Sequence, residues 1–268
     1  MVMSNKILLA LPILAGLSVL AALSRSGSAA PQAAANGGPI VLELFTSQGC
    51  SSCPPADRLL TRLSQDSALA GRVIPLSFHV DYWDYIGWQD PFDSPRWSER
   101  QRAYAQAFRS NRIYTPQLVI NGKTECVGSQ ELVVRQQIAS ALAAPPAGRV
   151  TLDASPDGAG DRLRVRVGAE MQAAAGGDLD LWVAVWETGL ATRVGAGENA
   201  SKTLRNDYVV RRLEKAFTLA GKAGARESTE MVLGLDKRWK RENLGVAAFL
   251  QDPATRVIYG AASQRLGG

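Results

Sequence analysis

The chain has 268 residues, of which 46% are hydrophobic and 21% are charged. This length allows one or two domains, and the apolar fraction excludes a disordered chain. A net charge of +5 is too small to predict a nucleic-acid partner, and three cysteines with one histidine exclude both a disulfide-dense small protein and a zinc site built mostly from histidine.

Residues 1–35 have the pattern of a signal peptide and leader. A single lysine precedes an apolar run from Ile7 to Leu23, and small residues follow, with suitable cleavage points after Ala30 and Ala35. The alternative is an uncleaved membrane anchor, for which the run is short and is interrupted by Pro12. We therefore expect a periplasmic or secreted protein that contacts a membrane only if this segment is retained. In such a compartment cysteine pairs persist as disulfides.

Residues 36–145 alternate between strand-like and helix-like segments, which predicts an α/β domain. Strands are expected at Pro39–Phe45, Arg72–Val80 and Gln117–Ile120, and helices at Pro54–Ser64, Ser94–Arg109 and Glu131–Leu142. Ser94 is a suitable N-cap for the second helix, and Pro95 suits its first position.

Residues 146–268 have a different periodicity, and the Ala- and Pro-rich loop from Ala143 to Gly148 precedes them. Apolar residues alternate with arginines around Val165 and with other residues around Val183, which predicts an antiparallel, sandwich-like β domain. Further short apolar runs lie at Met231–Leu235, Gly245–Phe249 and Arg256–Tyr259. The polar stretch Glu198–Leu213 departs from this strand pattern.

Two cysteines separated by two residues stand between an expected strand and an expected helix. Gly49 precedes the run CSSC from Cys50 to Cys53. The dipole and free amides of a helix N-terminus favour a thiolate, so the position suits a redox-active pair. We expect Cys50 to be the nucleophile and Cys53 to resolve the mixed disulfide. A static disulfide and a metal clip remain alternatives.

A proline directly before an expected strand is the second signal. Thr115 and Pro116 precede the strand Gln117–Ile120. Thioredoxin-like folds hold a cis-proline at this point, beside the CxxC motif, and it exposes the backbone of the preceding residue to an extended substrate. The alternative is an ordinary trans proline at the start of a strand.

Three segments, VLELFTSQGCSSCPPAD, FHVDYWDYIGWQDPF and YTPQLVINGKTECVGS, resemble an exported bacterial family called domain of unknown function 1223. The resemblance covers most of residues 39–268 and includes ENASKTLRNDYVVRRLEK. It implies a thioredoxin-like first domain with a redox-like site. It also singles out a possible interdomain or partner surface: Asn199, Lys202, Thr203, Arg205 and Asn206.

Two ionisable residues are candidates to support the cysteine pair. Glu43 shares a strand face with Val41 and Phe45, and a buried carboxylate without a partner would suit a proton relay, unless it lies on a solvated strand end. His79, the only histidine, falls near the C-terminal end of an expected strand. It either stabilises the Cys50 thiolate and moves a proton or is a satisfied core residue.

The stretch Asp81–Trp97 is long and rich in aromatic residues. We expect Trp83 and Trp88 to line a substrate groove or lid beside the motif, and the alternative is a small core that packs the loop onto the domain. Cys126 is the odd cysteine, either a free thiol, half of an intermolecular pair or a small buried residue, and we assign it no catalytic role.

Three functions fit these observations. The first is an oxidoreductase that acts on protein or small-molecule thiols and disulfides without a bound cofactor or resident metal. The second is a carrier of copper(I) held by Cys50, Cys53 and His79, although methionine is scarce. The third is a binding module in which the disulfide only braces a loop. The cysteine pair, Pro116 and the export signal together favour the first.

Overall fold

A computed structural model describes residues 1–2, 38–158 and 160–267. Apart from its first two residues, the predicted signal and leader lie outside this range. Within it, no helix is long and apolar enough to span a membrane.

All six elements expected in residues 36–145 are present. They are β1 (Ile40–Thr46), α1 (Pro54–Gln65), β2 (Val73–His79), α2 (Pro95–Ala107), β3 (Gln117–Ile120) and α3 (Glu131–Ala143), together with the 3-10 turn η1 (Asp84–Ile86) and the unexpected strand β4 (Thr124–Val127). Ser94 is the N-cap of α2, and its hydroxyl accepts from the Arg96 N–H at 3.3 Å. Strand β4 was missed because it is short and mostly not buried.

The second half of the chain consists of strands, as expected. They are β5 (Gly148–Asp157), β6 (Arg162–Met171), β7 (Leu179–Glu187), β8 (Leu190–Arg193), β9 (Thr203–Asn206), β10 (Val209–Leu219), β11 (Arg226–Gly234), β12 (Leu244–Gln251) and β13 (Ile258–Arg265), with the 3-10 turn η2 (Arg241–Asn243). The polar stretch Glu198–Leu213 also contains strands. It lacks an apolar pattern at β9 because this short strand of a two-stranded sheet buries only Leu204 and the polar Asn206.

Strands from both halves of the chain form one eight-stranded sheet in the order β13-β12-β7-β10-β2-β1-β3-β4. Strand β1 is parallel to β2 and antiparallel to β3. The halves meet where β10 runs parallel to β2, with Val209 opposite Ser77, and the Ser77 N–H donates to the Tyr208 carbonyl at 2.8 Å. The fold is therefore a mixed α/β arrangement with one large sheet and two smaller antiparallel ones. The expected boundary at residue 145 stays a prediction, because residues 34–268 form one compact unit.

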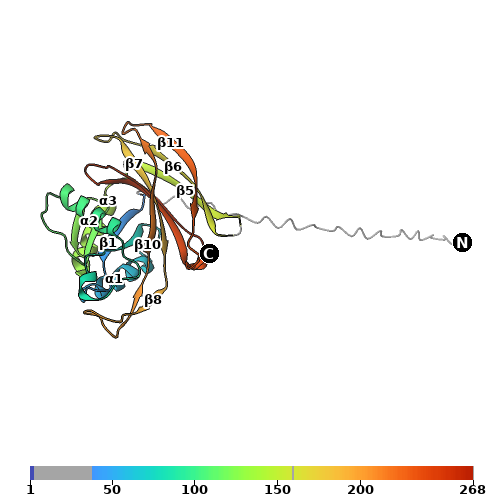
Figure 1. Cartoon of the computed structure of the whole chain (residues 1–268). Helices are drawn as coiled ribbons and strands as arrows, with labels where there is room; N and C mark the ends of the chain where they lie inside the picture. The colour runs from blue at the N-terminus through green and yellow to red at the C-terminus, as the bar shows by residue number, and fades with distance from the viewer. Residues whose placement is uncertain (3–37, 159, 268) are drawn as a thin grey trace. The chain divides into compact units, whose positions relative to one another are not determined.

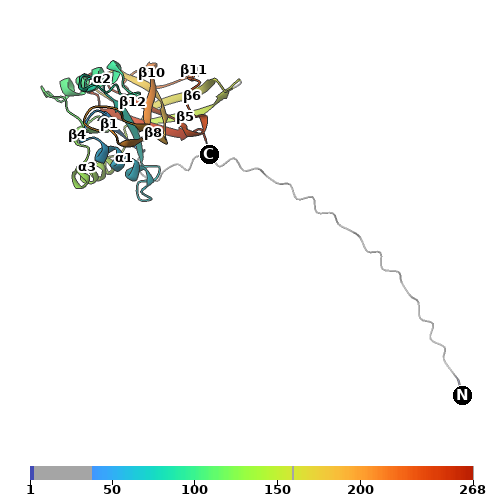
Figure 2. The same cartoon turned by 60° about the horizontal axis from the view of Figure 1, so that its bottom comes forward.

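The helices cover the two faces of the sheet around β1. Helices α1 and α3 lie on one face and α2 lies on the other (Figure 2). Leu42 and Leu44 of β1 pack with α1 and α3, whereas Val41 and Phe45 pack towards α2. Since successive strand residues point to opposite faces, this alternation fixes the side to which every residue at the end of β1 points.

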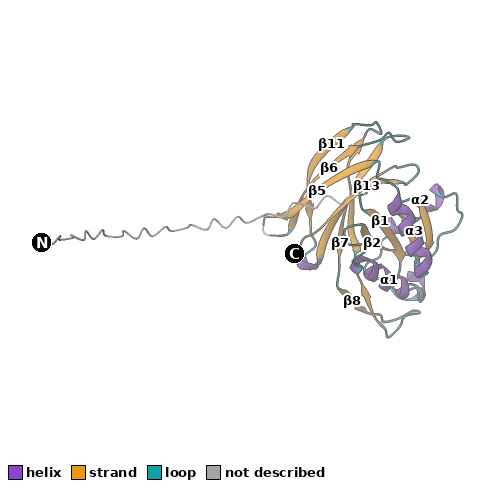
Figure 3. Cartoon of the chain, turned by 180° about the vertical axis from the view of Figure 1, so that it is seen from behind, coloured by secondary structure: helices purple, strands orange, loops and turns teal. Residues whose placement is uncertain are grey.

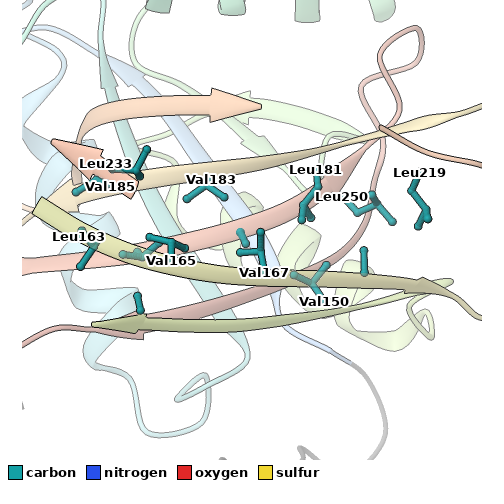
Figure 4. Close-up of a cluster of buried hydrophobic side chains, with 14 of the residues drawn as sticks. Val150, Leu163, Val165, Val167, Leu181, Val183, Val185, Leu219, Leu233 and Leu250 are labelled. Atoms are coloured by element: carbon teal, nitrogen blue, oxygen red, sulfur yellow. The ribbon is translucent and has the colours of Figure 1, made fainter. Parts of the chain in front are cut away.

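A separate core lies between the three-stranded sheet β11-β6-β5 and the large sheet. Val165 and Val167 of β6 face Leu181 and Val183 of β7, and further apolar residues extend the layer (Figure 4). These strands lie at the end of the unit away from the helices (Figure 1). The hairpin β8–β9 is separate from both of these sheets (Figure 3), and its strand β9 contacts α1.

Candidate functional site

The cysteines of the CxxC motif form a disulfide at the start of α1. After β1 ends at Thr46, the Cys50 N–H donates to the Ser47 carbonyl at 3.2 Å, and the Cys53 N–H donates to the Cys50 carbonyl at the same distance. The two cysteine Cα atoms are 5.4 Å apart, and Cys53 is the N-cap residue of α1. The motif thus has the strand before it and the helix after it that the sequence predicts.

Neither cysteine reaches the surface. Cys50 and Cys53 are both 0% exposed, whereas Ser51 and Ser52 between them are exposed. Thiol–disulfide exchange requires an incoming thiolate to contact a sulfur atom, so the groups that cover the disulfide control its reactivity.

The aromatic loop after β2 forms one part of this cover. Trp83 donates from Nε1 to the Thr115 hydroxyl at 2.8 Å and stacks on the exposed Tyr85. A Cβ added at Gly49 would lie only 3.0 Å from the Trp83 Cβ, so a glycine before Cys50 allows the loop to approach the motif closely. Trp83 therefore lies beside Gly49 and Thr115, and its contact with substrate stays a prediction.

A segment from the second half of the chain forms the other part of the cover. We call Val194–Lys202, which joins β8 to β9, the covering segment. The Glu198 carboxylate accepts from the Ser51 N–H at 2.8 Å. The buried Asn199 amide donates to the Gln48 carbonyl at 2.9 Å and to the Cys50 carbonyl at 3.0 Å. Two neighbouring side chains thus bind the backbone of the motif on both sides of Cys50.

The covering segment also packs on the aromatic loop. A Cβ added at Gly195 would lie 3.2 Å from the Trp88 ring, and one added at Gly197 would lie 2.8 Å from the Ile86 Cδ1. Trp88 is consequently packed between two parts of the chain rather than along an open groove. This contact fits the small-core alternative for Trp88, and a substrate role for it stays a prediction.

His79 and Asp90 form a fully buried pair close to the motif. The His79 Nδ1 lies 2.7 Å from the Asp90 Oδ2, which also accepts from the Gln48 N–H at 2.7 Å. His79 lies opposite Thr46 across β1 and β2, and this places it on the α1 side of the sheet. Its Nε2 is buried without a hydrogen-bond partner in the described part of the chain.

The charges of the pair shift both of its pKa values. Burial lowers the pKa of His79, but the charge and hydrogen bond of Asp90 outweigh it, so the net shift is upward. Burial raises the pKa of Asp90, and the charge of His79 together with hydrogen bonds outweighs that effect, so the net shift is downward. Both shifts favour the ion pair.

Asp57 is a second buried acid near the disulfide. Cys53 has helical backbone angles, and Asp57 follows it by one turn, its N–H donating to the Cys53 carbonyl at 3.1 Å. Residues four apart on a helix have neighbouring side chains. Burial raises the pKa of Asp57 to about 6, partly opposed by the positive charge of His79. Its Oδ1 is buried and unpaired among the described residues.

Glu43 is buried, as the strand alternation indicates, but it has partners. Its carboxylate accepts from the Arg100 Nε at 2.5 Å and from the Arg100 Nη2 at 3.0 Å, and it also accepts from the Tyr104 hydroxyl. It points to the α2 side of the sheet, opposite to the helix that carries Cys53. The proton-relay hypothesis required a buried carboxylate without a partner, and Glu43 does not meet that requirement.

The Thr115–Pro116 peptide bond is cis and lies next to the motif. Phe45 of β1 pairs with Gln117 of β3, which brings Pro116 level with the end of β1. The predicted proline geometry is therefore present. The substrate-binding role of the Thr115 backbone stays a prediction.

Cys126 lies in β4, buried among side chains from the α1 and α3 layer, and it is unpaired. Burial, with a contribution from the Glu125 charge, raises the pKa of its thiol to about 11, so it is a poor nucleophile. Across the described ranges, no three His, Cys, Asp or Glu side chains converge as metal ligands. The copper hypothesis therefore gains no ligand cluster beyond the cysteine pair.

Sequence reasoning missed several residues of this site. Asp57 could have been found from its spacing, since it follows Cys53 by one turn. Asp90 and Gln48 carry no pattern of their own. The resemblance singled out Asn199 and Asn206, and both bind Gln48, which precedes the motif. The Asn199 amide donates to the Gln48 carbonyl, and the Gln48 side-chain amide donates to the Asn206 Oδ1 at 2.9 Å.

Comparisons with known proteins place the chain in a family. A crystal structure of a structural-genomics target from Agrobacterium tumefaciens is 28% identical, with 88% of this chain and 97% of that chain covered and a TM-score of 0.64. HBP35 of Porphyromonas gingivalis is 16% identical, with coverages of 87% and 76% and a TM-score of 0.66, and it shows the fold alone. A search of the curated proteins found no match.

The family model described as "Protein of unknown function (DUF1223)" matches residues 41–251, which include the motif, the aromatic loop and the covering segment. This match confirms the resemblance noted in the sequence. The chain belongs to the DUF1223 family.

Proposed function

We propose that the protein is a thioredoxin-like thiol–disulfide oxidoreductase that works after export, in the periplasm or outside the cell, on protein or small-molecule thiols. The observation that carries this proposal is the Cys50–Cys53 disulfide at the start of α1. On the same side of the sheet, buried atoms of Asp57 and His79 have no hydrogen-bond partner within the described ranges. Perturbed ionisable groups beside a redox-capable pair are typical of a working site.

The topology around the motif supports the thioredoxin-like assignment. A parallel pair, β1 and β2, is connected by α1, and β3 and β4 extend the sheet antiparallel beyond β1. The CxxC motif lies at the end of β1 with Pro116 beside it. Thioredoxin-like proteins place their redox motif at this position.

The chemistry is a two-electron exchange. A substrate thiolate attacks one sulfur of the disulfide, a mixed disulfide forms and the other cysteine leaves as a thiolate. A second substrate thiolate then attacks the mixed disulfide. The substrate leaves oxidised to a disulfide, and Cys50 and Cys53 remain reduced. The reverse sequence reduces a substrate disulfide, with Cys50 attacking and Cys53 resolving.

Each cysteine that leaves as a thiolate must gain a proton, and each that attacks must lose one. Asp57 is suited to this exchange, because its pKa of about 6 lets it hold or release a proton near neutral pH. His79 supports it through its charge. The Thr115 backbone and Trp83 would position an extended substrate beside Cys50.

The redox equilibrium of the mature protein tests the proposal. Protein is equilibrated across graded glutathione buffers, thiols are alkylated, and the labelled cysteines are identified by mass spectrometry. We expect one reversible two-electron transition of Cys50 and Cys53, with Cys126 unchanged. Oxidation of a reduced dithiol peptide should be lost in Cys50→Ser and retained in the control Cys126→Ser.

A binding module with a structural disulfide is the second candidate, and the complete burial of both cysteines favours it. Under this alternative the pair stays oxidised throughout the titration, and Cys50→Ser affects stability without affecting any thiol exchange. The same experiment thus separates the two functions.

A further inference from the structure

We propose that Glu198 and Asn199 are positioning residues that hold the covering segment over the disulfide, and that they make the site selective for extended polypeptide substrates over small thiols. The inference deepens the proposed function and rests on it, because it concerns access to the same cysteine pair.

The closed site leaves no route from solvent to the sulfur atoms. Both cysteines are 0% exposed, although the two serines between them are on the surface. A thiolate must reach a sulfur along the S–S bond for exchange to occur. Reaction therefore requires the cover to move.

Few hydrogen bonds attach the covering segment to the motif. Glu198 accepts from the Ser51 N–H, and Asn199 donates to the carbonyls of Gln48 and Cys50. The Lys202 ammonium donates to the Asn199 Oδ1 at 3.0 Å and orients the amide. Both hydrogen-bonding side chains come from adjacent positions, so loss of either one should loosen the whole attachment.

The covering segment belongs to a two-stranded hairpin that is suited to opening. It joins β8 and β9, whose four-residue strands pair only with each other and not with the large sheet. A two-stranded hairpin has little independent stability, and regions with few buried contacts open most readily. Asn206 of β9 stays bound to Gln48, so the end of the hairpin next to β10 stays attached.

When the covering segment opens, a substrate must replace the hydrogen bonds that the segment made with the motif. Its departure frees one backbone donor, the Ser51 N–H, and the carbonyls of Gln48 and Cys50. An extended polypeptide offers a carbonyl and amide groups that satisfy both kinds of partner, as in strand addition. A small thiol such as dithiothreitol has no amide groups to replace these bonds. The hydrogen bonds to the Gln48 and Cys50 carbonyls are buried, and leaving such groups unpaired is costly, so loss of these two bonds disfavours the small thiol more than the polypeptide.

The test compares Asn199→Ala and Glu198→Ala with the wild type and with Arg193→Ala, an exposed control on β8 that makes no hydrogen bond or ion pair to the motif among the described residues. The rate of disulfide reduction is measured with dithiothreitol and with an extended peptide that carries two thiols. Each rate is referred to the rate for the same protein in denaturant, where all four should agree.

We expect both alanine variants to be reduced by dithiothreitol about tenfold faster than the wild type, since each loses hydrogen bonds that keep the segment closed. Arg193→Ala should match the wild type. The ratio of the peptide rate to the dithiothreitol rate should fall in both variants. Circular dichroism checks the fold of Asn199→Ala, and Glu198→Ala removes an exposed side chain.

Folded wild type that is reduced as fast as denatured protein, or variants with unchanged rates and ratio, would overturn the inference and leave the proposed function standing. Faster reduction in the variants without a reversible glutathione transition would support the gate and refute the oxidoreductase function. The two proposals therefore fail in distinguishable ways.

Discussion

Among single residues, the buried acids Glu43 and Asp57 show how differently the protein accommodates a carboxyl group in its interior. Glu43 is matched by Arg100, whose guanidinium is buried with it, and this pair is part of the core. Among the described residues Asp57 forms no such ion pair, and burial raises its pKa to about 6. An unmatched buried carboxyl beside a cysteine pair destabilises the folded protein when it is ionised, which is the pattern expected of a functional group.

The raised pKa of Asp57 should make the free energy of unfolding depend on pH. Between its ordinary pKa of 3.8 and about 6, the folded protein holds a proton that the unfolded chain has released, so this group makes the free energy of unfolding fall as pH rises. In Asp57→Asn that fall is absent, and the variant should gain up to about 3 kcal/mol on the wild type between pH 4 and pH 7. Urea denaturation across this range measures it. Asp178→Asn, at an exposed position, is the control, and parallel curves for Asp57→Asn and wild type would refute the prediction.

At the scale of elements, the site is made where two loops meet over the start of a helix. The aromatic loop approaches through Gly49 and the covering segment through Gly195 and Gly197. Gly197 also has a φ of +73°, a conformation that costs other residues roughly 1–2 kcal/mol. Close approach and backbone conformation both require glycine at this position.

Replacement of this glycine should both destabilise the fold and open the site. In Gly197→Ala the new Cβ would lie 2.8 Å from Ile86, so either the loop or the covering segment must shift. Gly224→Ala is the matched control, because Gly224 has a φ of +80° and no atom within 4 Å of an added Cβ. Both variants should lower the urea midpoint, and only Gly197→Ala should speed reduction by dithiothreitol. Equal reduction rates in the two variants would show that the contact with Ile86 does not matter.

At the scale of the whole molecule, the two halves of the chain share a sheet and a core. Phe45 and Phe78 from the first half pack in one cluster with Trp186 and Phe249 from the second. The Arg100 guanidinium also donates to the Gln251 Oε1 at 3.0 Å, which links α2 to β12. The covering segment adds a third connection, at the site itself.

A fragment of residues 36–145 should therefore fail to fold by itself. Removal of the second half exposes the edge of β2, the apolar cluster behind it and the disulfide. We expect the fragment to show no cooperative thermal transition by circular dichroism, while the full mature chain unfolds in a single transition. A fragment with a cooperative transition would establish residues 36–145 as an independent domain, as the sequence alone suggests.

The local features of the protein could be predicted from the sequence. Except for β4, periodicity located the strands and helices of the first half within about two residues, Ser94 marked a helix start, and the CxxC motif was placed between β1 and α1. These features depend on residues close together in the chain, and their spacing is visible directly. Strand β9 within Glu198–Leu213 was missed because its four residues bury only Leu204 and the polar Asn206, which is too few to leave an apolar pattern.

The environment of the disulfide was decided by the tertiary structure alone. Glu198 and Asn199 contact the motif from 147 and 149 residues away, and Asp90 reaches His79 across a loop. Sequence alternation indicated that Glu43 is buried, but it could not show that Arg100 occupies the same place. Contacts between residues distant in the chain produce no periodic pattern in the amino-acid sequence, because they depend on which surfaces the folded sheet brings together. The position of the cysteine pair between a strand and a helix thus follows from local sequence, whereas its enclosure follows from contacts that only the folded chain makes.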